Sequence, residues 1–168
     1  MERWRRIDEA PEEDAAAELR TCCGASRWID RMLVRRPFGS LQAARAAARD
    51  EWFALSADDW KEAFAHHPRI GDSVARLSTF ASGSARSSVR EQAGVNDADA
   101  GLLNALLAAN REYEARFGYI FIVCATGKTA AEMLAILRQR LSNGSEAEIR
   151  IAAEEHAKIC DLRLAASM

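Results

Sequence analysis

Two short segments of the chain carry the side chains best suited to acid–base chemistry. The first, His66–Asp72, ends a helical pattern, and the second, Ser88–Gly94, places Ser88, Glu91 and Gln92 at positions i, i+3 and i+4. On a helix this spacing puts the three side chains on one face. An imidazole, a carboxylate, a hydroxyl and an amide together suit proton transfer on a small polar ligand.

The proline at position 68 decides how the histidine before it is presented. A proline disfavours the α region for the preceding residue, so His67 is expected in an extended or turn conformation. We therefore expect the imidazole of His67 at the end of a helix, where it can face a cleft. His66 lies one residue outside this arrangement, and it is expected to cap the helix or face solvent.

Residue types alone also permit less specific interpretations of these segments. A single histidine at a helix end is more often a capping or surface group than a catalyst. The face formed by Ser88, Glu91 and Gln92 is usually a solvated helix surface. The three histidines, at positions 66, 67 and 156, show no His-x-x-x-His spacing, so no metal site is expected.

Two other motifs suggest chemistry and are better explained by structure. Gly127-Lys128-Thr129 resembles the end of a phosphate-binding loop, but the first glycine of that motif is replaced by Ile122. A loop followed by a helix that Thr129 caps is the favoured interpretation. Cys124 lies within an apolar run and is expected in the core rather than as a nucleophile.

Composition excludes several classes of protein. The chain has 168 residues, 49% of them hydrophobic and 29% charged, with a net charge of −2, which is typical of a globular domain with its own core. Such a charge favours neither nucleic acid nor an anionic membrane surface as a partner. The four cysteines form no Cys-x-x-Cys pair and are expected to be buried free thiols.

The sequence shows no segment that would direct the chain into or across a membrane. The N-terminal residues lack the apolar stretch of a signal peptide, and the longest apolar run, Tyr119–Ala125, is far too short to span a bilayer. We therefore expect a cytoplasmic protein.

Hydrophobic periodicity and capping residues predict an all-α fold, a single-domain bundle of about seven or eight helices over residues 1–168. The expected helices are Pro11 to about Cys23, a short helix capped by Ser26, Leu41–Leu55 capped by Ser40, a helix from a Ser56–Asp59 capping box to His66, a helix from about Ser87 to Gly94, Ala98 to about Arg116, a helix capped by Thr129, and a last helix with a Ser145–Glu148 capping box.

Two stretches between these helices are harder to interpret. Ser73–Ser88 is rich in serine, alanine and arginine and is expected to be a loop with an irregular helical turn. Tyr119–Ala125 has the composition of a strand, but no second strand is present to pair with it. A buried extended linker is the alternative for this stretch.

At the residues singled out above, the chain resembles the OHCU decarboxylase family, whose substrate is 2-oxo-4-hydroxy-4-carboxy-5-ureidoimidazoline (OHCU). The resemblance covers the chain from about residue 30 to 164 in ordered pieces. These pieces are Arg36-Pro-Phe38, His67-Pro-Arg-Ile-Gly71, Ser88-x-x-Glu-Gln-Ala-Gly94, Asn110-x-x-Tyr-x-x-Arg-Phe-Gly-Tyr-Ile-Phe121, its continuation through Ile122–Lys128, and Lys158-Ile-x-x-Leu-Arg-Leu164.

The resemblance implies a helical enzyme that is usually a homodimer, uses neither metal nor organic cofactor, and converts OHCU to (S)-allantoin and CO2 in urate breakdown. It implies that His67 is the catalytic proton donor and that Glu91 assists it by orienting the hydroxyl or by raising the basicity of the histidine. The implied substrate-binding residues are Pro68, Ser88, Val89, Arg90, Glu91, Gln92, Phe121, Ile122, Val123, Cys124, Ala125 and Arg163.

Decarboxylation is chemically coherent with these residues. Loss of CO2 leaves an electron pair that the imidazoline ring can delocalise, so the protein has only to position the carboxylate, discourage water and return one proton. Arg163 could pair with the carboxylate or hold Glu91, and the sequence does not distinguish the two. Two alternatives remain: a helical binding or regulatory module without activity, and a decarboxylase of a related ureido-ring acid.

Overall fold

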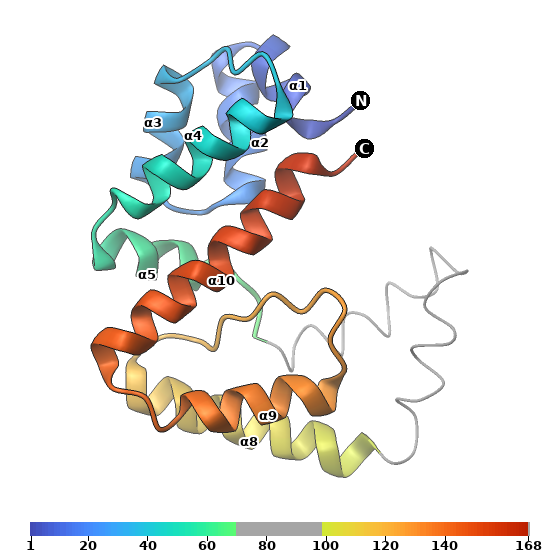
Figure 1. Ribbon diagram of the computed structural model, residues 1–168, viewed down its shortest axis with the longest axis vertical. Helices are drawn as coiled ribbons and strands as arrows, with labels where there is room; N and C mark the ends of the chain where they lie inside the picture. The colour runs from blue at the N-terminus through green and yellow to red at the C-terminus, as the bar shows by residue number, and fades with distance from the viewer. Residues whose placement is uncertain (70–98, 168) are drawn as a thin grey trace. The chain divides into compact units, whose positions relative to one another are not determined.

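The structure, a computed structural model, describes residues 1–69 and 99–167 (Figure 1). These residues form eight helices, and none of them lies in a β-strand. The all-α expectation is therefore confirmed. The predicted helix near Ser87–Gly94 and the predicted loop over Ser73–Ser88 lie outside the described residues.

The chain divides into two compact units. Unit 1 comprises residues 1–67, 122–124 and 146–168, and unit 2 comprises residues 68–121 and 125–145. Whether the whole chain behaves as one domain stays a prediction. No helix of the described residues is both long enough and apolar enough to cross a bilayer.

Unit 1 packs the last helix of the chain against the first five. Its helices are α1 (Arg3–Glu9), α2 (Glu12–Cys22), α3 (Ser26–Val34), α4 (Leu41–Phe53), α5 (Ala57–Ala65) and α10 (Ser145–Ala165). The two ends of the chain meet, since the backbone N–H of Arg3 donates to the carbonyl of Ala166 at 3.0 Å (Figure 1). Unit 1 is thus built from both ends of the sequence.

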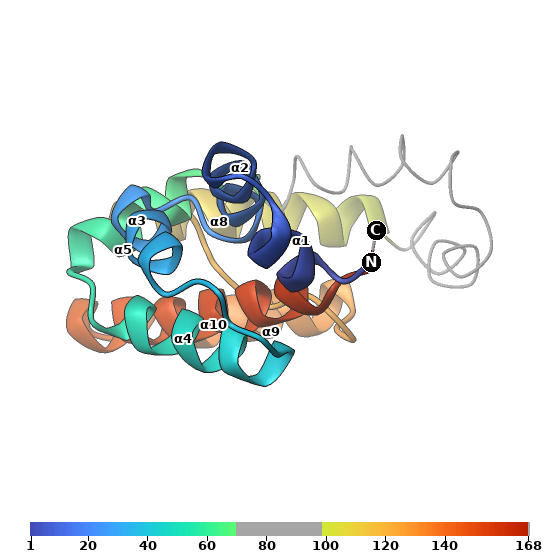
Figure 2. The ribbon, with the colours of Figure 1, turned by 90° about the horizontal axis from the view of Figure 1, so that it is seen from above.

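Helices α4 and α10 run antiparallel along each other (Figure 2). Arg45 pairs with Asp161 at 2.8 Å near one end of the contact. Toward the other end, the indole N–H of Trp52 donates to the carbonyl of Ala153 at 2.9 Å. Because both Trp52 and Ala153 are buried, this bond satisfies the indole nitrogen within the core.

Local capping signals account for the starts of α4, α5 and the later helix that begins after Thr129. The Ser40 hydroxyl accepts from the N–H of Ala43, and Ser56 forms the expected capping box with Asp59. The prediction for Ser26 was wrong: it is the first residue of α3, and its hydroxyl donates to Glu62 at 2.6 Å. A carboxylate from α5 therefore takes the hydroxyl that was expected to cap α3.

Helix α1 was not predicted from the sequence. It has no side-chain cap and no acidic residue in its first turn, so both usual start signals are missing. Its only buried residues are Trp4 and Ile7, which lie one turn apart. Tertiary packing of these two side chains, rather than local propensity, holds the helix in place.

Unit 2 contains two helices among the described residues, α8 (Asp99–Phe117) and α9 (Ala130–Arg140), which pack against each other (Figure 1). The capping box that starts α9 joins Thr129 to Glu132, as its sequence indicated for the threonine. Gly118, with φ of +83°, ends α8 in a left-handed conformation that a residue with a side chain rarely adopts.

The stretch Tyr119–Ala125 is neither helix nor strand. Tyr119 and Phe121–Cys124 are buried, whereas Ala125 is exposed. The linker interpretation is therefore the one observed. In unit 2, Phe121 packs beneath the guanidinium of buried Arg140, whose Cζ lies 4.6 Å from the ring centre.

Candidate functional site

His67 lies at the end of α5, where the sequence placed it. The C-cap of α5 is His66, and the backbone N–H of His67 donates to the carbonyl of Phe64 at 3.1 Å. His66 and Pro68 are exposed, and His67 is partly buried. The helix thus ends just before the proline and leaves the imidazole of His67 against the interior of unit 1.

The ring of His66 lies over Gly24, a buried residue in the connection between α2 and α3. A Cβ atom at position 24 would lie 2.4 Å from Cγ and Cδ2 of His66 and 2.7 Å from its Cβ. Only glycine allows this approach. The α2–α3 connection therefore supports the backbone from which His67 projects.

The imidazole of His67 meets a second imidazole that the sequence analysis did not assign to the site. The rings of His67 and His156 lie edge to face, with ring centres 5.0 Å apart and an interplanar angle of 86°. Burial, the positive charge of Arg163 and the neighbouring His66 lower the pKa of His67 from 6.5 to about 4. The ring of His67 is therefore neutral at pH 7.

His156 is completely buried on α10. It stacks on Trp52 with ring centres 4.2 Å apart, and neither ring nitrogen has a hydrogen-bond partner among the described residues. Leaving a buried polar group unpaired costs about 1–3 kcal/mol. Burial, His67 and Arg163 hold its pKa well below the usual value, so this ring is neutral as well.

One sequence signal could have indicated His156. His156, Cys160 and Arg163 are spaced i, i+4 and i+7 along the last helix, which places them on one face. Arg163 had been assigned to the site by resemblance, so its helical neighbours were candidates too.

Arg163 supplies a fixed positive charge near both imidazoles. One terminal guanidinium nitrogen, Nη1, donates to the carbonyls of Thr21 and Cys22, each at 3.2 Å. These carbonyls lie at the C-terminal end of α2, where the helix dipole favours a cation. The same charge contributes to the lowered pKa of His67 and of His156.

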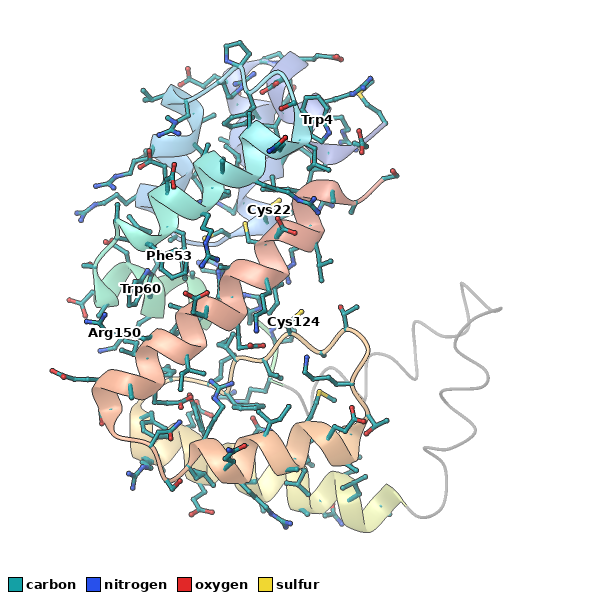
Figure 3. The ribbon with its side chains drawn as sticks, in the orientation of Figure 1. Trp4, Cys22, Phe53, Trp60, Cys124 and Arg150 are labelled. Atoms are coloured by element: carbon teal, nitrogen blue, oxygen red, sulfur yellow. The ribbon has the colours of Figure 1, made fainter. Side chains whose placement is uncertain are left out.

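Residues Ile122–Cys124 belong to unit 1 and are buried. The backbone N–H of Cys124 donates to Oε2 of Glu155 at 2.8 Å, and Figure 3 shows Cys124 beside the middle of α10. This bond fixes the segment against the helix that carries His156. A backbone held in this way can present its remaining polar groups to a ligand.

The remaining predicted site residues are distributed as follows. Pro68 belongs to unit 2, where the adjacent Arg69 forms a two-point ion pair with Glu114 at 2.7 and 3.0 Å. Arg69 lowers the pKa of that carboxyl. Phe121 and Ala125 also belong to unit 2. The predicted binding segment, Ser88, Val89, Arg90, Glu91 and Gln92, lies outside the described residues.

The cysteines are buried free thiols, as expected (Figure 3 labels Cys22 and Cys124). Burial raises the pKa of Cys22 and of Cys160, and it raises the pKa of Cys23 to about 12. Protonated thiols are poor nucleophiles. Within residues 1–69 and 99–167, no cluster of three His, Cys, Asp or Glu side chains could hold a metal ion.

A surface pocket of about 430 Å³ also opens in unit 1, lined by residues of α3, α4 and α10 that include Trp28, Arg45, Trp52 and His156. Arg45 is already paired with Asp161 across the pocket wall. His67, Ile122–Cys124 and Arg163 are not part of its lining. The candidate site is the histidine pair with Arg163, and it shares only His156 with the lining of this pocket.

Comparisons with known proteins identify the family. The family model described as OHCU decarboxylase matches residues 8–165. The uric acid degradation bifunctional protein TTL of Arabidopsis thaliana is 41% identical over 150 residues, which are 88% of this chain and 45% of that protein. The uric acid degradation bifunctional protein of Bacillus sp. (strain TB-90) is 25% identical over 165 residues, 98% of this chain and 32% of the relative.

The chain thus spans less than half the length of these two bifunctional relatives. A solved structure matches end to end: a crystal structure of OHCU decarboxylase in the presence of (S)-allantoin superposes with a TM-score of 0.70 at 36% identity, covering 93% of this chain and 96% of that one. Because the family model matches nearly the whole length of the chain, the chain belongs to the OHCU decarboxylase family.

Proposed function

We propose that this protein decarboxylates OHCU to (S)-allantoin and CO2 as a step of urate breakdown. Family membership supports the reaction, and the relative of solved structure was crystallised in the presence of (S)-allantoin. The observation that carries the proposal is the placement of His67 at the end of α5, against a second imidazole and close to the charge of Arg163.

The reaction needs few groups from the protein. The bond between the ring carbon and the carboxylate breaks, its electron pair passes into the imidazoline ring, and CO2 leaves. One proton is consumed overall, and a new C–H bond forms at a ring carbon. The protein must hold the carboxylate, exclude water and deliver the proton to one face of the ring.

The lowered pKa of His67 determines how this residue takes part. The ring is neutral before substrate binds, because burial and Arg163 disfavour a second positive charge. A carboxylate that pairs with Arg163 offsets that charge and raises the pKa of His67. The imidazole then takes up a proton in the complex and delivers it to the substrate carbon, as a general acid does.

The other predicted residues complete the proposal by resemblance. Glu91 orients the substrate hydroxyl or raises the basicity of His67. The ureido group and the ring are bound by Pro68, by the segment Ser88, Val89, Arg90 and Gln92, and by the main chain of Phe121, Ile122, Val123, Cys124 and Ala125. Of the two roles open to Arg163, the carboxylate partner is favoured, because its charge already acts on His67.

Three further properties belong to the same proposal. The reaction proceeds without metal or organic cofactor, because the substrate ring itself delocalises the electron pair; activity should therefore survive exhaustive dialysis against a chelator. The enzyme is a homodimer, which sedimentation equilibrium can test. It is cytoplasmic, in keeping with the absence of a membrane-spanning helix in the part of the chain described.

The test is production of optically active allantoin from freshly made substrate. OHCU is generated in the cuvette from urate with the two preceding enzymes, and (S)-allantoin is followed by circular dichroism. The wild-type protein should accelerate its appearance well above spontaneous decay. His67→Asn should lose nearly all of this acceleration while keeping its helical spectrum, because the proton donor is gone.

The matched control is His66→Asn, the same change at the exposed neighbouring histidine. This variant should keep activity within about threefold of wild type. Full activity in a folded His67→Asn protein would exclude the proposed role of His67. No acceleration by wild type at micromolar protein would favour a helical binding module, and turnover of only a related ureido-ring acid would identify a different substrate.

A further inference from the structure

The imidazole of His156 is the least explained polar group in unit 1. It is fully buried, and neither ring nitrogen has a hydrogen-bond partner among the described residues. Core packing alone would be served by a phenylalanine of similar shape, stacked on Trp52 as this ring is. A buried imidazole without a partner therefore points to another state of the protein, in which its nitrogens form a hydrogen bond.

Among the residues that the structure describes, the one titratable side chain in ring contact with His156 is His67, at a centre-to-centre distance of 5.0 Å. Two imidazoles joined by an N–H···N bond have centres about 5 Å apart, since the N···N distance is about 3 Å and each nitrogen lies about 1 Å from its ring centre. The rings are thus already at the right separation, and rotation of one side chain would align them.

Trp52 keeps His156 in this place. Its indole N–H is anchored to the carbonyl of Ala153 on α10, one turn before His156. The stacked arrangement leaves the edge of the imidazole, which carries the nitrogens, free of Trp52. Among the described residues, the charge of Arg163 acts on both rings, His66 acts on the ring of His67, and His67 acts on the ring of His156.

We propose that His156 is a positioning residue for His67: its unprotonated ring nitrogen accepts a hydrogen bond from His67 when that ring carries the proton. The inference rests on the proposed function, in which His67 is neutral at first and protonated during turnover. Because burial and the charge of Arg163 disfavour protonating both rings, the two imidazoles take up only one additional proton between them. The bond stabilises this transient imidazolium and fixes the plane of its ring.

The test compares two substitutions at position 156. His156→Phe keeps the ring shape and the stacking on Trp52 but removes the acceptor, whereas His156→Gln restores an acceptor oxygen. We expect His156→Phe to lower kcat on the order of 10- to 100-fold, as loss of a hydrogen bond to a charged group does, with little change in KM. His156→Gln should recover at least part of this loss.

A second measurement does not depend on turnover. The pKa of His67 is measured in the ligand-free protein by nuclear magnetic resonance of labelled histidines. It should fall by about one pH unit in His156→Phe, because the protonated ring loses its acceptor. In wild type, the ¹⁵N signals of His156 should shift with the same midpoint as those of His67.

The outcomes separate this inference from the proposed function. If kcat and the pKa of His67 are both unchanged in a folded His156→Phe protein, the imidazole is only a packing residue and the inference is wrong. If the ¹⁵N signals of the two rings shift with the same midpoint but wild type shows no decarboxylation, the inferred hydrogen bond is supported and the proposed activity is wrong. If His156→Phe does not fold, the wild-type signals decide: independent midpoints for the two rings overturn the inference.

Discussion

Acid should destabilise unit 1 through His67. The folded protein binds the proton on this ring only below pH 4 or so, whereas the unfolded chain binds it below about pH 6.5. Between these values the unfolded state holds more protons, so stability rises with pH. The contribution of His67 is therefore complete above pH 6.5 and is lost as the pH falls toward 4.

The size of the effect follows from the two pKa values. At about 1.4 kcal/mol for each pH unit between them, the whole window corresponds to roughly 3 kcal/mol. Integrated only from pH 7 to pH 5, the expected loss from His67 is about 2 kcal/mol. This loss is a large fraction of the stability of an ordinary domain.

The assay is urea unfolding followed by tryptophan fluorescence. All four tryptophans, at positions 4, 28, 52 and 60, belong to unit 1, so the signal reports the unit that contains the ring. Unfolding free energies are measured at pH 7 and pH 5 for wild type, for His67→Asn and for the control His66→Asn. The loss between the two pH values should be about 2 kcal/mol smaller in His67→Asn than in the other two proteins.

The comparison removes other titrating groups. The carboxylates are present in all three proteins, so their contributions cancel in the differences. His156 contacts His67, so its titration is followed by nuclear magnetic resonance in each protein and its contribution is subtracted. If His67→Asn loses as much stability between pH 7 and pH 5 as wild type, the imidazole of His67 is not desolvated. In that case burial would not hold the imidazole of His67 neutral in the ligand-free protein.

Two other predictions concern the supports of the site. Gly24→Ala should destabilise unit 1 by about 1–3 kcal/mol, because the new Cβ would lie 2.4 Å from the ring of His66. Urea unfolding followed by far-ultraviolet circular dichroism, which reports the helices of both units, checks this. The control Gly101→Ala changes a glycine in α8 of unit 2 that has open space around it, and it should instead stabilise by about 0.5–1 kcal/mol; equal effects would refute the steric explanation. Glu155→Ala removes the acceptor of the Cys124 N–H, so amide hydrogen exchange at Cys124 should accelerate about tenfold. An unchanged exchange rate would mean that the carboxylate does not hold this segment.

The parts of the fold that the sequence predicted are those with local signals. Ser40, Ser56 and Thr129 each cap the helix that follows them, because a hydroxyl next to free N–H groups needs no distant partner. Ser26 looked the same in the sequence, but a carboxylate on another helix takes its hydroxyl. Whether such a hydroxyl caps its own helix depends on contacts between helices, and these contacts cannot be predicted from a single sequence.

In the candidate site, too, features with a local signal could be predicted from the sequence, and contacts between helices could not. His67 could be predicted at a helix end because Pro68 follows it, which is a local constraint. His156 could not be paired with His67, because the contact depends on how α10 packs against α4 and α5. Resemblance to the family contributed Arg163, and the structure adds that its charge acts on both histidines. The role of Glu91 stays a prediction.

The assembly of unit 1 from both ends of the sequence has a consequence for its synthesis. Helices α1–α5 leave the ribosome well before α10, which buries Ala152, Ala153 and His156. At about 5–20 residues per second, residues 66–165 take on the order of 10 s to appear. During this time the apolar surface that α10 will cover stays open to chaperones. A circular permutant that joins the adjacent ends and opens the chain before Ser145 would make these six helices consecutive, and unit 1 should then fold earlier on the ribosome.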